Sequence, residues 1–81
     1  MNVRSEVLAQ MRSVAQEQGK KLVPLADDIV LLESGLDSLC FAIIVARLED
    51  SLGIDPFATT QEQDFPVTVG DFIRFYENAA R

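Results

Sequence analysis

One serine in this chain stands where a hydroxyl group can carry chemistry. Ser38 lies in the run Gly35-Leu36-Asp37-Ser38-Leu39, directly before an apolar segment with helical spacing. The first turn of a helix has unpaired backbone N–H groups and the positive end of the helix dipole, which suits an anion such as a phosphate ester. The chain has no histidine that could activate the hydroxyl, so Ser38 would be a poor nucleophile. We therefore expect another enzyme to modify Ser38, and we expect no catalytic residue in the chain itself.

The composition excludes several other classes of function. With no histidine and a single cysteine, Cys40, the chain offers no zinc cluster, no disulfide framework and no Ser-His or Cys-His pair. Thirteen acidic and seven basic residues give a net charge of −6, which argues against nucleic acids and anionic membranes as partners. No apolar run approaches the roughly 20 residues of a membrane span, and Met1–Gln10 lacks a secretory h-region. We expect one domain over residues 1–81, monomeric, cytoplasmic and without a metal.

The spacing of apolar residues predicts two helices in the first two thirds of the chain. The first runs from about Asn2 to Gln18, and Gly19 is a typical C-terminal stop. The second begins at Asp37 or Ser38, either of which can cap it, and ends at Leu52 before Gly53. The long connection between them, Lys20–Leu36, carries apolar side chains that should pin it to the core, among them Leu25, Ile29, Leu32 and Leu36.

The remainder of the chain predicts two more helices. A proline after Asp55 favours a short third helix near Phe57–Gln61. Thr68 and Asp71 form a variant capping box that opens a final helix over Val69–Asn78. No segment alternates as a strand would, so the predicted fold is an all-α bundle of three long helices and one short one. Its expected interior is Val7, Met11, Val14, Phe41, Val45, Leu48, Val69, Phe72 and Tyr76.

The second helix has two apolar faces, whereas a surface helix needs only one. Phe41, Ile44, Val45, Leu48 and Leu52 share the expected core face. Leu39, Ile43 and Ala46 cluster on the opposite side with Asp50 between them in angle. The second face either packs under the long loop or binds partners, and exposed apolar patches tend to mark interaction sites.

The run Gly35-Leu36-Asp37-Ser38-Leu39 resembles the phosphopantetheine attachment motif of acyl carrier proteins. The resemblance covers almost the whole chain, because it includes the first helix, the long loop, the second helix and the start of the last one at Thr68-Val69. It implies an acyl-carrier-like four-helix bundle whose Ser38 is esterified with 4′-phosphopantetheine. It also implies an acyl or aminoacyl cargo carried as a thioester, in fatty-acid, polyketide or nonribosomal peptide biosynthesis.

The resemblance also implies partners and roles for residues around Ser38. A phosphopantetheinyl transferase would engage Asp37, which is an N-cap by the alternative interpretation. Activating ligases or synthases would dock on the second helix, at Leu39, Ile43, Ala46, Arg47 and Asp50. Fatty-acid-type carriers bear acidic residues at the positions of Cys40 and Ile43, so this chain is expected to be a specialised carrier outside primary fatty-acid synthesis. The alternative is a small helical adaptor that binds proteins through the same helix without a prosthetic group.

Overall fold

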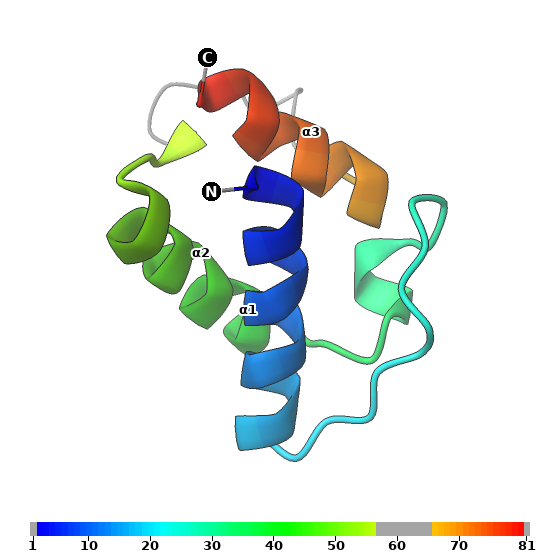
Figure 1. The fold of residues 1–81 in the computed structure, drawn as a ribbon. Helices are drawn as coiled ribbons and strands as arrows, with labels where there is room; N and C mark the ends of the chain where they lie inside the picture. Colours follow the sequence, from blue (N-terminus) through cyan, green and yellow to red (C-terminus); the bar gives the residue numbers. More distant parts are fainter. Residues whose placement is uncertain (1, 57–65, 81) are drawn as a thin grey trace.

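The computed structural model describes residues 2–56 and 66–80, which form three α-helices and one short 3₁₀-helix (Figure 1). The elements are α1 (Val3–Glu17), η1 (Leu31–Glu33), α2 (Ser38–Leu52) and α3 (Val69–Ala79). The predicted all-α class is confirmed, since the described residues add only an isolated bridge between Val30 and Thr68. The short helix predicted at Phe57–Gln61, and with it the count of four, lies outside the described residues. None of the described helices is long and apolar enough to cross a membrane.

Side chains cap each α-helix at its N-terminus, as the sequence predicts for the second and last helices. Asn2 accepts a hydrogen bond from the Ser5 amide at the start of α1. At α3, Thr68 accepts from the Asp71 amide and Asp71 accepts from the Thr68 amide, which completes the capping box. These bonds satisfy amide groups that the helices leave unpaired.

The C-terminus of α1 is closed by a left-handed turn at Gly19. The Gly19 amide donates to the Gln16 carbonyl at 3.3 Å, and the Lys20 amide donates to the Ala15 carbonyl at 2.8 Å. This pair of bonds, with φ of +67° at Gly19, is the Schellman arrangement. It fixes the direction in which the chain leaves α1 and holds the backbone of Lys20 in one place.

The core lies where α1 packs against both α2 and α3. Its buried apolar side chains are Val7, Met11, Val14, Ala15, Leu31, Leu36, Cys40, Ile44, Leu48, Val69, Phe72, Ile73 and Tyr76. An edge-to-face contact between Phe41 and Phe72, with ring centroids 6.0 Å apart, joins α2 to α3. Phe41 and Val45 were predicted as interior residues but are only half-buried. The helix is rotated so that Cys40, Ile44 and Leu48 point most directly into the core.

The long loop is held against the bundle by backbone hydrogen bonds as well as by apolar side chains. The Leu31 amide donates to the Val67 carbonyl and the Val69 amide donates to the Ile29 carbonyl, at 2.9 and 2.8 Å. Arg4 of α1 forms an ion pair with Asp27 of the loop. Leu36 is buried, and Leu25 and Ile29 pack on the core as expected. The expectation for Leu32 was wrong: the η1 turn directs Leu31 inward and leaves Leu32 71% exposed.

A substitution at Leu48 tests which face of α2 points into the core. Its side chain is completely buried, so Leu48→Ala should lower the free energy of unfolding by about 2–5 kcal/mol through lost contacts and a residual cavity. Leu39→Ala on the same helix is the matched control, because Leu39 is 62% exposed. Urea denaturation followed by circular dichroism measures both. Equal losses for the two variants would contradict the observed phase of α2.

Candidate functional site

Ser38 is the first residue of α2 and its side chain is exposed to solvent. No hydrogen bond joins its hydroxyl to the described part of the chain. The residue before it, Asp37, has the extended backbone of an N-cap, and its Oδ1 accepts the Cys40 amide at 2.9 Å. The cap interpretation of Asp37 is therefore confirmed. The hydroxyl of Ser38 is left accessible beside the unpaired amides of the first helical turn.

The segment before Ser38 is positioned by a close crossing of two stretches of the loop. The Val23 amide donates to the Ser34 carbonyl at 3.0 Å. Next to this bond, Gly35 has φ of +107° and lies so close to Lys21 that a Cβ would overlap the Lys21 carbonyl oxygen. Only glycine fits both the backbone conformation and the space. The glycine of the motif therefore brings the start of α2 beside the end of α1.

Ser34 contributes to the same turn from inside the protein. Ser34 is completely buried, and its hydroxyl donates to the Leu31 carbonyl at 2.6 Å. This bond satisfies a hydroxyl that would otherwise be costly to bury. Ser34 thus serves the turn, whereas Ser38 four residues later faces solvent.

The crossing places a cation against Asp37. Lys20 Nζ lies 3.1 Å from Asp37 Oδ2. The Cys40 amide, the Cys40 thiol and the Lys20 ammonium all favour the ionised carboxylate, and they lower the pKa of Asp37 to about 2. The same carboxylate raises the pKa of Lys20. Both oxygens of Asp37 are therefore engaged within the protein, one by the backbone and one by Lys20.

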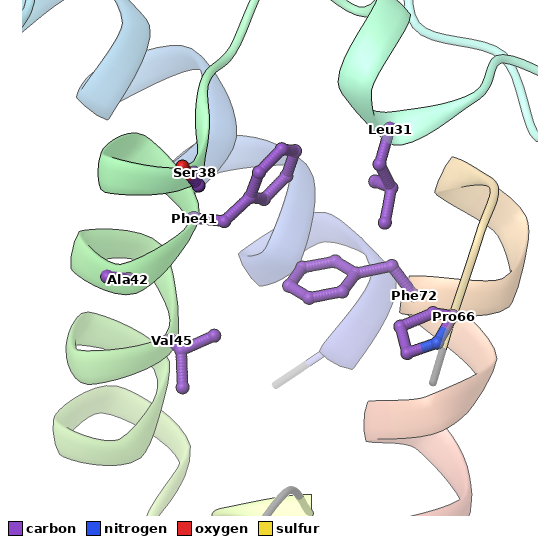
Figure 2. Close-up of a pocket in the computed structure, with 7 residues that line it drawn as sticks. All are labelled: Leu31, Ser38, Phe41, Ala42, Val45, Pro66 and Phe72. Carbon is purple, nitrogen blue, oxygen red and sulfur yellow. The ribbon is translucent and has the colours of Figure 1, made fainter. Parts of the chain in front are cut away.

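An apolar groove opens beside Ser38, between α2 and the segment that leads into α3 (Figure 2). Its volume is about 530 Å³, and its lining residues are Leu31, Ser38, Phe41, Ala42, Val45, Pro66 and Phe72. Figure 2 shows the rings of Phe41 and Phe72 directed toward each other across this space, with Ser38 at the N-terminal end of α2. Val30, Leu32 and Val67 line an adjoining hollow that shares Leu31, Ser38, Phe41 and Pro66 with this groove. The second apolar face of α2 expected from the sequence did not reveal this groove, which depends on residues from three separate segments.

The predicted partner-binding residues of α2 differ in exposure. Leu39, Ala46 and Asp50 are exposed, and Leu39 shows 62% of its surface. Ile43 is half-buried and packs against the core. Arg47 forms an ion pair with Glu17 of α1, with Nη2 and Oε1 2.5 Å apart. This ion pair raises the pKa of Arg47 and lowers that of Glu17. Leu39 and Ala46 therefore form the outward apolar part of the helix.

Comparison with known proteins gives no assignment. No protein-family model, no curated protein and no solved structure matches this chain. Among residues 2–56 and 66–80, no three histidine, cysteine, aspartate or glutamate side chains are grouped as a metal site would require. The candidate function therefore depends on the geometry around Ser38 and on the motif that contains it.

A substitution at Gly35 tests the close approach of the two loop segments at Gly35 and Lys21. Gly35→Ala should lower the free energy of unfolding by at least about 1–3 kcal/mol, because its φ is unfavourable for alanine and its Cβ would strike the Lys21 carbonyl. Gly19→Ala is the matched control: its φ is also positive, but nothing lies within 4 Å of the added Cβ. For the control, we expect the free energy of unfolding to fall by about 1 kcal/mol. Thermal and urea unfolding measure both, and a smaller loss at Gly35 than at Gly19 would contradict the close approach.

Proposed function

We propose that this chain is a carrier protein whose Ser38 is esterified with 4′-phosphopantetheine and whose cargo is held as a thioester on that arm. The observation that supports it most directly is the exposed Ser38 hydroxyl at the start of α2, beside a capping aspartate and at the rim of an apolar groove. The motif and the order of the helices add to this support. An attachment serine must be reachable by a separate enzyme, and an exposed N-terminal helix position meets that need.

The proposed modification requires coenzyme A and a phosphopantetheinyl transferase. The Ser38 oxygen would attack the phosphorus that bears pantetheine, and the bond between this phosphorus and the bridging oxygen would break. The adenosine bisphosphate portion would leave, while the serine proton would pass to a base of the transferase. This chain supplies the hydroxyl and its presentation. The transferase must supply the base, since Ser38 has no hydrogen-bonded base within the described residues.

The groove beside Ser38 favours a cargo with an apolar portion. It is lined almost entirely by carbon-rich side chains, and the attachment residue itself belongs to the lining. An acyl chain tethered at Ser38 could remove apolar surface from water by entering it, which is favourable by about 25 cal/mol per Å². Loading and unloading enzymes, an activating ligase or a synthase, would dock on the outward residues Leu39, Ala46 and Asp50. We place the carrier outside primary fatty-acid synthesis because α2 lacks acidic residues near its start.

The modification itself is tested by intact mass. After incubation with a broad-specificity phosphopantetheinyl transferase and coenzyme A, the protein should gain the mass of one phosphopantetheine. Ser38→Ala should gain nothing, and Ser34→Ala is a control for serine position because Ser34 is buried. A mass gain that persists in Ser38→Ala, or none in the wild type, would reject the proposal.

The cargo groove is tested by loading acyl chains of different length. Octanoyl cargo should raise the unfolding temperature of the modified protein above that of the acetyl form, because only the longer chain can fill the groove. Ala42→Asp should remove this difference by placing a charge in the lining, since Ala42 is exposed and belongs to the groove. Ala46→Asp, on the exposed side of the same helix, is the control. Equal unfolding temperatures for the acetyl and octanoyl forms would show that the groove does not bind the acyl cargo.

The second candidate, an adaptor without a prosthetic group, is favoured by the exposure of Leu39. A large apolar side chain that is 62% exposed on a helix is consistent with a binding anchor. An adaptor would bind its partner equally well as wild type and as Ser38→Ala. The mass measurement above separates it from a carrier.

A further inference from the structure

The contact between Lys20 and Asp37 joins two segments that are distant in sequence. Lys20 follows the Schellman turn of α1, and Asp37 caps α2. The packing of Gly35 on Lys21 and the bond from the Val23 amide to the Ser34 carbonyl keep these segments side by side. The backbones on both sides of the ion pair are therefore fixed, although the two side chains are partly exposed, at 38% and 49%.

The charge of Asp37 has opposite consequences for folding and for modification. As the cap of α2, the carboxylate accepts the Cys40 amide and must be ionised to interact best with the helix dipole. It also puts a negative charge directly beside the Ser38 hydroxyl. The pyrophosphate of coenzyme A is anionic, so an uncompensated carboxylate would oppose its approach. Lys20 Nζ, 3.1 Å from Oδ2, lies well within the roughly 8 Å over which charges act at physiological ionic strength.

We propose that Lys20 is a positioning residue for the modification of Ser38, because it holds the Asp37 carboxylate in the cap and offsets its charge where coenzyme A must approach. This inference rests on the proposed carrier function. It predicts that the cation matters for the rate of modification more than for stability. An exposed ion pair contributes little to folding because water screens it, and the cap bond from the Cys40 amide remains without Lys20.

The experiment compares modification kinetics of variants that differ at one lysine. Lys20→Ala should lower kcat/KM for coenzyme A by roughly two- to fivefold, mainly through KM. Lys20→Glu should lower it further, and Lys20→Arg should restore most of the wild-type value. Lys21→Ala is the matched control, since it changes the net charge equally while Lys21 forms no ion pair with the described part of the chain. The difference between Lys20→Ala and the control should disappear at about 1 M salt, where screening acts within roughly 3 Å.

Three results would overturn the inference while the carrier function stands. Wild type and Lys20→Ala could be modified with the same kcat/KM, or Lys20→Ala and Lys21→Ala could be slowed equally, which would indicate net charge alone. A variant that loses stability but keeps its KM would show a structural role only. If the wild type gains no mass at all, the carrier function fails first and this inference falls with it.

The geometric part is tested without a transferase by titrating the Asp37 carboxyl group with NMR. In the wild type the pKa of Asp37 is lowered to about 2 from 3.8. Lys20→Ala should raise this pKa, because one of the groups that favour the ionised form is lost, and Lys21→Ala should leave it unchanged. An unaltered Asp37 pKa in Lys20→Ala would show that the two side chains are not in contact in solution.

Discussion

The close approach of Gly35 to the Lys21 carbonyl is the constraint on which the rest of the site depends. It brings the turn before α2 against the chain that leaves α1, so that the cap of one helix meets the cation that follows the other. Any side chain at position 35 would separate the two segments. The motif glycine is thus required for long-range packing as well as for a local turn, and the position of Ser38 follows from that packing.

The apolar residues of helix α2 face three different environments: the core, the groove and solvent. Ile44 and Leu48 enter the core, Phe41 and Val45 line the groove, and Leu39 faces solvent. This explains why the helix shows more apolar character than a single buried stripe requires. The half-burial of Phe41 and Val45 costs some core packing. In exchange, the helix presents an apolar wall directly below Ser38, which a fully interior position could not do.

Local signals made the helices predictable, whereas contacts between distant segments did not follow from them. The helix bounds, the capping box at Thr68 and the stop at Gly19 depend on neighbouring residues. Spacing and cap chemistry predicted the bounds of α1, α2 and α3 to within about one residue, and they also predicted the capping box and the stop. The groove and the ion pair between Lys20 and Asp37 depend on how the long loop folds back. The same dependence explains why the expectation for Leu32 was wrong. Its apolar side chain suggested burial, but the fold of the loop at η1 leaves it exposed.

The absence of an acidic residue at position 40 has a structural reason in this chain. Cys40 is almost fully buried, and its amide donates to the Asp37 carboxylate. A carboxylate at position 40 would be removed from water and placed beside a second negative charge, which is unfavourable on both counts. The start of α2 can therefore keep its acidic cap only if the next inward position is neutral. In the proposed carrier, partners would therefore contact α2 at Leu39 and the exposed residues after it, where apolar surface stands instead of acidic residues.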